Sequence, residues 1–386
     1  MNSPMVDQVD RRNPSAHHQL LLQALRDPRS IHDIGNQDWE LLLRLARRAR
    51  LLGFLAVELE HAALLDNIPM RVANHLRSGL IQARKFQQLA RWELDRILWA
   101  LGEDRAPIIV LKGMAYLLAG LPHAAGRVFA DLDLLVPAET LQQTESILLA
   151  NGWQHHELSA YDEHYYRTWS HEIPALIHCE RETEVDIHHS LTSPIGRLKL
   201  ETAPFRETAV RLPGLEVSVL SPPDMALHCA VNLFQNNELA DDIRHLLDLH
   251  GMLQFFSADQ PLFLDNLITR ANHQGVGRPL FYGLYFSKLL LQTPVPDTLM
   301  TRIERRPGWL ALKVMQLCVP LALLPLHPDL PCRSAKFARW WLYWRSHWLR
   351  MPLHILLPHL AYKFYLSVFP HKAVNTSSDG ITVKTK

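Results

Sequence analysis

The spacing of apolar positions divides the chain into two helical regions with a segment of short strands between them. In residues 17–104, apolar side chains recur every three or four positions, as at Leu41 and Leu45, which is typical of amphipathic helices. Residues 70–101 contain no proline and a single glycine, so they predict one long helix.

Helical spacing returns from Pro222 onward, where Asp224 is placed to cap a first helix. Prolines at 294–296 and 320–331 predict breaks between later helices. The predicted helices of this region cover about residues 224–234, 239–250, 260–274, 276–291 and 308–325.

Residues 105–221 instead predict a small mixed sheet. Short apolar or β-branched runs alternate with turns, and residues 138–151 have a helical period that stops at Gly152. The predicted fold class is therefore α+β, with this core flanked by an N-terminal helical region and a larger C-terminal helical region. The predicted strands cover residues 107–111, 131–136, 152–157, 174–179, 183–189 and 215–220.

The same pattern sets the expected domain boundaries. The polar ends of the chain, residues 1–16 and 373–386, are predicted to be disordered. The segments between them are a helical region at 17–104, an α/β core at 105–221, a helical domain at 222–332 and a basic and aromatic helical tail at 333–372.

Tryptophans and basic residues are interspersed in this tail, as at Trp340, Trp344, Arg345 and Arg350. Two interpretations fit the composition. Residues 339–369 could make a peripheral contact with a membrane surface. Alternatively, the helix packs its tryptophans against the body of the protein.

Composition and charge narrow the class of protein. With a net charge of +1, the chain has no overall basic field, so nucleic acid is not favoured as a partner. The four cysteines are far apart and form no CxxC motif, which argues against a disulfide scaffold or a zinc ribbon. The N-terminus lacks the apolar segment of a signal peptide, and no apolar run approaches the roughly 20 residues that span a bilayer. We therefore expect a cytoplasmic protein that is at most peripheral to a membrane.

The candidate chemistry begins with two carboxylates, Asp131 and Asp133, inside an apolar run. Residues two apart on a strand point to the same face, and their Cα atoms lie about 7 Å apart. On another predicted strand, Glu184, Asp186 and His188 share one face. Two or three acids placed together gain nothing from burial, but they can hold one divalent cation or a pair of them.

Three acids on neighbouring strands are what metal-dependent nucleotidyl or phosphoryl transfer requires, with Mg²⁺ or Mn²⁺ as the ion. Asp131 and Asp133 would bind the ions. Asp186 would complete the second metal site or accept the proton of the attacking hydroxyl. Glu184 aligns with Asp186 and could be a spare ligand, and His188 either contacts the substrate or orients a neighbour.

The turn at Lys112–Gly113 suits the same chemistry. A glycine after a strand lets backbone amides approach a phosphate, and the following helix N-terminus adds a favourable dipole. Lys112 or Arg127 would neutralise a triphosphate, although Arg127 fits an ion pair with a carboxylate equally well. Arg244 and Asp248, one turn apart on a predicted helix, are expected to pair with each other.

Other reaction classes find no support in the sequence. It has no P-loop, GxGxxG or GxSxG motif, and His171–Glu172 lacks the second histidine of HExxH. Cys179 has no obvious activating neighbour. Metal-assisted transfer is thus the chemistry that the motifs favour.

Taken in order, these motifs resemble the nucleotidyltransferase superfamily. The resemblance is carried by Leu111–Lys112–Gly113, by Arg127 ahead of Asp131–Leu132–Asp133, and by Val185–Asp186–Ile187–His188. They are most similar to an uncharacterised bacterial branch described as nucleotidyltransferase family proteins, over about residues 105–290. The resemblance implies that Asp131, Asp133 and Asp186 are the catalytic and metal-binding residues, and that Lys112, Gly113, Arg127 and His188 bind the nucleotide.

The resemblance also implies a reaction: transfer of an NMP from an NTP, such as ATP, to an unidentified hydroxyl or phosphate acceptor on a small molecule or protein. One residue departs from the wider superfamily, since Met114 stands where a serine would contact phosphate. Lys112 is expected to substitute for that serine. The departure leaves an alternative open: a non-catalytic module on the same fold that binds nucleotide or a partner and could be peripheral to a membrane.

Overall fold

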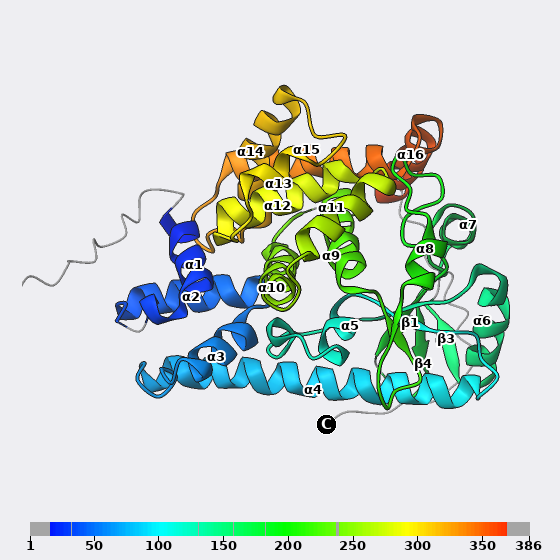
Figure 1. The fold of residues 1–386 in the computed structure, drawn as a ribbon, viewed down its shortest axis with the longest axis horizontal. Coiled ribbons are helices and arrows are strands. Elements are labelled where there is room, and N and C mark those ends of the chain that lie inside the picture. The colour runs from blue at the N-terminus through cyan, green and yellow to red at the C-terminus, as the bar shows by residue number, and fades with distance from the viewer. Residues whose placement is uncertain are drawn as a thin grey trace, which may run out of the picture.

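The computed structural model describes residues 16–368, apart from single positions at 32, 130, 157, 182, 237 and 238. The ends that were predicted to be disordered, residues 1–16 and 373–386, lie outside the described residues except for Ala16, which begins the first helix. Figure 1 shows the sheet on the right, with helices beside and above it.

Seven short strands form one mixed sheet. They are β1 (Ile109–Val110), β2 (Asp131–Leu135), β3 (Trp153–His155), β4 (Leu176–His178), β5 (Glu184–His188), β6 (Val210–Arg211) and β7 (Ser218–Val219). Their order is β3-β4-β5-β2-β1-β7-β6, and central β2 pairs in parallel with β5 and antiparallel with β1. Six strands lie inside predicted runs. The seventh, β6, was missed because it consists of two exposed residues with no apolar period.

Helices make up the remaining regular structure. Before the sheet come α1 (Ala16–Arg26), α2 (Asn36–Arg48), α3 (Leu52–His61) and α4 (Met70–Leu101). Among the strands lie α5 (Lys112–Leu118), α6 (Leu141–Ala150), α7 (Ala160–Trp169) and α8 (Thr202–Glu207). After the sheet come α9 (Pro222–Val231), a π-helical turn (Asn232–Asn236), α10 (Ile243–Asp259), α11 (Phe263–His273), α12 (Gly277–Leu291), α13 (Asp297–Thr301), α14 (Trp309–Leu323), α15 (Arg333–Arg350) and α16 (Leu353–Val368).

The predicted α+β fold class is confirmed, with a small mixed sheet between helical regions. The predicted long helix is α4, whose 32 residues extend for about 48 Å along the lower side of Figure 1. The predicted break at 320–331 falls between α14 and α15, although α14 continues through Pro320 to Leu323. A proline this close to the helix end removes only one of the last backbone hydrogen bonds, so the helix tolerates it.

Buried apolar side chains form two clusters, and three helices, α4, α10 and α12, take part in both. The first cluster surrounds the sheet, and the second joins α1–α3 to α10, α12, α14 and α15. Helix α4 contributes Leu94 and Ile97 to the first cluster and Leu76 and Leu80 to the second, and α10 is divided in the same way. Because each fully buried Leu or Ile stabilises by about 1.5–3 kcal/mol, the helices before and after the sheet are held together by a shared core.

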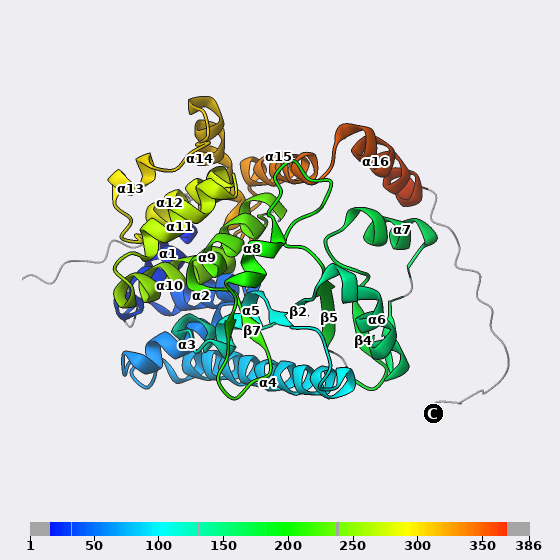
Figure 2. The same cartoon turned by 45° about the vertical axis from the view of Figure 1, so that its right-hand side comes forward.

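The predicted helical tail consists of α15 and α16, which lie along the upper side of the molecule in Figures 1 and 2. Trp341 packs against the second apolar cluster, whereas Trp340, Trp344 and Trp348 are exposed. Of these four tryptophans, Trp341 alone packs against the body of the protein, as the second interpretation of the tail requires. None of the helices in the described part of the chain has the length and hydropathy needed to span a bilayer.

Two glycines let the start of α3 touch the loop that precedes β2. A Cβ on Gly53 would lie 2.5 Å from the carbonyl oxygen of Gly126, and a Cβ on Gly126 would lie 2.5 Å from the backbone nitrogen of Phe54. No side chain fits at such distances. The contact therefore fixes the part of this loop next to Arg127.

Replacing Gly126 with alanine should lower the free energy of unfolding by about 1–3 kcal/mol, because the added methyl group must push the α3 backbone away. Urea unfolding of the wild type and the variant measures the change. Gly308→Ala is the matched control, since a Cβ there meets nothing within 4 Å, and it should alter stability by less than about 0.5 kcal/mol. Wild-type stability of Gly126→Ala would contradict a tight backbone contact.

Candidate functional site

The three predicted acids converge at the centre of the sheet. Strands β2 and β5 pair in register, so that Asp131 lies opposite Glu184 and Asp133 lies opposite Asp186. Because side chains alternate along a strand, all four acids share one face of the sheet. One carboxylate oxygen from each of Asp131, Asp133 and Asp186 lies within 4.8 Å of those of the other two. The structure thus brings together a group of three acids that could hold a metal ion.

Glu184, the fourth acid on this face, lies outside that group of three. It is the first residue of β5, its side chain is 45% exposed, and its Oε1 atom lies 3.8 Å from Nε2 of His156. A spare ligand role therefore has no geometric support in this arrangement.

Asp133 is the acid with the most contacts. Its side chain is only 3% exposed, Lys112 Nζ forms an ion pair with its Oδ1 atom, and His188 Nε2 lies 2.9 Å from the same oxygen. Burial alone would raise the pKa of Asp133, but Lys112 and the hydrogen bond with His188 hold it well below its usual range. The carboxylate is therefore charged and held in one orientation.

The other charges of the site follow from these contacts. Burial alone would lower the pKa of Lys112, but the carboxylates of Asp133 and Asp131 raise it above its usual range. Burial raises the pKa of Asp186 to about 8, and the nearby carboxylates of Asp133, Glu172 and Asp131 act in the same direction. The acidic group thus contains more negative charge than Lys112 can neutralise.

Lys112 reaches Asp133 from an unusual backbone conformation. Its φ angle is +47°, in the left-handed region that residues other than glycine seldom adopt. Such a conformation costs on the order of 1 kcal/mol or more and persists where the surrounding structure demands it. Here it turns the chain from β1 into α5 while the lysine side chain reaches across to β2.

Steric crowding requires a glycine at position 113, a reason that differs from the predicted approach of backbone amides to a phosphate. A Cβ at this position would overlap the guanidinium of Arg127 and lie 2.8 Å from the ring of Phe129. Arg127 is 6% exposed, and its Cζ atom lies 5.7 Å from the ring centre of Tyr116. The glycine therefore makes room for a buried arginine. The next residue, Met114, is 1% exposed and packs in the core.

Arg127 forms an ion pair with a carboxylate, one of its two expected roles, and its partner is Asp248, which was expected to pair with Arg244. Its Nε atom donates to both carboxylate oxygens of Asp248, at 3.2 and 3.0 Å. Arg244 instead donates from Nη1 to the backbone oxygen of Val128, at 2.6 Å. The predicted Arg244–Asp248 pair was therefore wrong, because the loop before β2 inserts Arg127 between sheet and α10.

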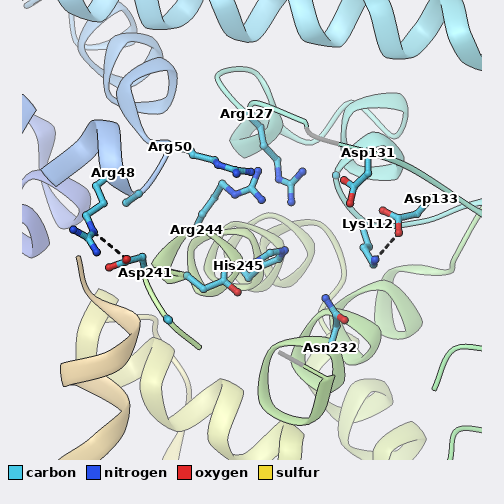
Figure 3. Close-up of a pocket in the computed structure, with 14 residues that line it drawn as sticks. Arg48, Arg50, Lys112, Arg127, Asp131, Asp133, Asn232, Asp241, Arg244 and His245 are labelled. Atoms are coloured by element: carbon cyan, nitrogen blue, oxygen red, sulfur yellow. Dashed lines mark hydrogen bonds and ion pairs between the residues drawn. The ribbon is translucent and has the colours of Figure 1, made fainter. Parts of the chain in front are cut away.

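A cavity of about 500 Å³ opens beside the acidic group. Asp131, Asp133 and Lys112 lie at one side of it, and Arg50 and Arg244 project into it from the other, as Figure 3 shows. Burial lowers the pKa of Arg244 to about 10, and the neighbouring charge of Arg127 acts in the same direction. Carboxylates and guanidinium groups thus face one another across a space of ligand size.

Several residues of this cavity were not expected from the sequence. Arg50 comes from the turn between α2 and α3, where its φ angle is +57°. Arg244 comes from the first turn of α10, and Asn232 begins the π-helical turn. Short π-helical segments are frequent at functional sites, but a local sequence pattern does not reveal them.

Glu172 contacts His188, which in turn contacts Asp133. It pairs with His188 through a β-bridge, and its Oε2 atom lies 3.4 Å from Nδ1 of His188. His188 is 1% exposed and stands between Glu172 and Asp133. Glu172 and His188 also form, with His171, a second group whose ligand atoms lie within 4.8 Å of one another. The geometry suits His188 to orienting Asp133, the second of its two expected roles.

The Arg127–Asp248 pair yields a stability prediction. Asp248 is 2% exposed, so Asp248→Ala would leave a buried arginine without its counter-charge and should cost about 3–5 kcal/mol in the free energy of unfolding. The control is Asp297→Ala, because Asp297 forms an ion pair with Lys288 while 88% exposed. Denaturant unfolding should show a loss below about 1 kcal/mol for this control. Equal losses in the two variants would contradict a structural role for the buried pair.

Comparison with known proteins identifies the family to which the chain belongs. The model of a family described as "Uncharacterised nucleotidyltransferase" matches residues 35–292. The match begins some seventy residues before the similarity seen in the sequence motifs, and it therefore includes α2–α4 and Arg50. No curated protein and no solved structure matches the chain significantly. The matched region contains the acidic group and the arginines of the cavity, and the chain belongs to the uncharacterised nucleotidyltransferase family.

Proposed function

We propose that this protein transfers an NMP from an NTP to a hydroxyl or phosphate acceptor, releases pyrophosphate and depends on Mg²⁺ or Mn²⁺. Family membership supports nucleotidyl transfer as the general activity. The observation that carries the finer proposal is the convergence of Asp131, Asp133 and Asp186 beside a cavity with arginines on its other side.

The donor set fits a hard divalent cation. All three candidate ligands are carboxylates, which supply the oxygen ligands that Mg²⁺ and Mn²⁺ favour. Lys112 supplies one positive charge to a group of three carboxylates. Burial is the main cause of the raised pKa of Asp186, and the neighbouring carboxylates raise it further. When bound, such an ion would polarise phosphate oxygens and stabilise the charge that develops on them.

The chain's own residues would act as follows. Asp131 and Asp133 hold the metal, and Lys112 and His188 keep Asp133 charged and oriented. The acceptor oxygen forms a bond to the α-phosphorus, while the bond from this phosphorus to the bridging oxygen breaks and pyrophosphate leaves with the electron pair. Asp186 either completes a second metal site or takes the proton of an attacking hydroxyl.

The arginine side of the cavity suits the triphosphate. Arg127, which the sequence offered equally for this role and for an ion pair with a carboxylate, is paired with Asp248 and almost wholly buried. Arg50 is exposed toward the cavity, and Arg244 lies next to it in Figure 3. Guanidinium groups bind phosphate oxygens through two parallel hydrogen bonds. We therefore assign the β- and γ-phosphates to Arg50 and Arg244.

Metal-dependent nucleotide binding tests the proposal. Calorimetry with each NTP should show binding that requires Mg²⁺ or Mn²⁺, and Asp131→Asn should weaken it at least about tenfold, because the metal loses a ligand. Asp259→Asn, on the exposed surface of α10, is the control and should bind as the wild type does. Absence of binding for every NTP, or unchanged binding by Asp131→Asn, would refute the proposal.

A labelled α-phosphate distinguishes an enzyme from a binding module. Wild-type protein supplied with this NTP and a cell extract should pass the label to an acceptor, whereas Asp131→Asn should not. Tight NTP binding without any label transfer would instead favour the non-catalytic alternative.

The triphosphate assignment has its own test. Arg50→Gln should weaken NTP binding roughly tenfold, equivalent to about 1.4 kcal/mol, and leave NMP binding unchanged, because NMP lacks the β- and γ-phosphates. Arg47→Gln is the matched control, since Arg47 is exposed near the end of α2 but does not line the cavity. If Arg50→Gln weakened NTP and NMP binding equally, or neither, the assignment would be wrong.

A further inference from the structure

A second, apolar cavity lies away from the acidic group. It has a volume of about 800 Å³ and is formed by α12, α14, α15 and α16, with contributions from residues near Leu198 and Phe234. In Figures 1 and 2 these helices cover the upper side of the molecule, opposite α4. We call this cavity the tryptophan groove, after the four tryptophans that line it: Trp340, Trp341, Trp344 and Trp348.

The groove is apolar and open at the surface. Trp340, Trp344 and Trp348 follow one another at four-residue spacing on one face of α15, and their exposed fractions are 56%, 41% and 45%. On α16, Leu353 and Leu357 are 51% and 61% exposed. Monomeric proteins seldom expose a continuous apolar area of this kind unless it binds something.

The charged residues at the groove are all of one sign. Its described lining contains Arg197, Arg278, Arg305 and Arg345, and no aspartate or glutamate. Arg345 donates to the backbone oxygen of Phe234 at 2.9 Å. Arg197 lies over the ring of Trp348, with 4.2 Å between its Cζ atom and the ring centre. These guanidinium groups therefore have neutral partners within the groove and no carboxylate.

The electrostatics of Arg345 agree with a site for an anion. Burial lowers its pKa to about 10, against the opposing effect of Tyr282, and the positive charge of Arg278 lowers it further. An anionic group placed among these arginines would reverse that effect.

We infer that the tryptophan groove binds an anionic phospholipid of a membrane surface, with an aliphatic chain along the tryptophans and leucines and the phosphate at the arginines. Tryptophan beside arginine is the combination found where proteins meet the lipid interface. The aliphatic chain accounts for the apolar walls, and the phosphate accounts for four arginines without a carboxylate.

A second copy of the chain fits the groove less well. If two copies docked through this same face, a two-fold contact would place the groove of one against that of the other. The arginines of both copies would then meet with no groove carboxylate to neutralise them. Charge complementarity therefore favours an anionic lipid over self-association.

Vesicle sedimentation with the full chain tests the inference. The protein should sediment with vesicles that contain phosphatidylglycerol and stay in solution with vesicles of phosphatidylcholine alone. Trp344→Ala and Arg278→Gln should each weaken binding to the anionic vesicles roughly tenfold. Trp99→Ala is the matched control, because Trp99 is 71% exposed on α4, and it should bind as the wild type does.

Two further measurements keep the result unambiguous. Thermal unfolding confirms that each variant is folded, and phospholipids brominated in the chain should quench the fluorescence of the wild type more than that of Trp344→Ala. Failure to bind anionic vesicles, equal loss in Trp99→Ala and Trp344→Ala, or a dimer that Trp344→Ala dissociates would each overturn the inference. Nucleotide binding is measured separately, so this outcome does not decide the proposed activity.

Discussion

The register between β2 and β5 is the constraint on which the candidate site depends. Parallel pairing places Asp133 opposite Asp186 and directs both toward Asp131. A slip of one residue would turn the acids of one strand to the opposite face of the sheet. The apolar residues between the acids prevent this slip, since Leu132 and Val185 are fully buried on that opposite face. Packing of the apolar face thus determines the geometry of the polar one.

The charges around this strand pair are compensated unequally. Asp133 has Lys112 as its counter-charge, and Arg127 has Asp248. Asp131 faces the cavity from one side and Arg50 and Arg244 face it from the other, so the cavity presents both oxygen ligands for a cation and donors for a phosphate. Arg244 lies on α10 and Arg50 in the turn between α2 and α3, and the second apolar cluster holds these helices in place. Helices α4 and α10 belong to both clusters and so join them to the sheet. The complete cavity therefore requires the helices on both sides of the sheet.

The same arrangement connects the cavity with the tryptophan groove. Asn232 lines the first and Phe234 lines the second, and both belong to one π-helical turn. Arg345 holds this turn from the groove side through the backbone oxygen of Phe234. A ligand of the groove and a ligand of the cavity would consequently contact two sides of the same few residues.

The sequence by itself determined the local elements and the three acids. Periodicity identified α4 and six of the seven strands, and the alternation of side chains placed Asp131, Asp133 and Asp186 on strand faces where they could meet. These features depend on residues that are close together in the chain, and the spacing of apolar and polar positions reveals them.

Only the tertiary structure decided which charges meet and which apolar side chains stay exposed. Arg127 and Asp248 are 121 positions apart, and no periodicity distinguishes that pair from the expected Arg244–Asp248 pair. Nor does spacing distinguish Trp341, which is partly buried against the second apolar cluster, from Trp340, which is 56% exposed. The partner of a charge and the burial of a side chain are set by how distant segments pack, and a local pattern carries no information about that packing.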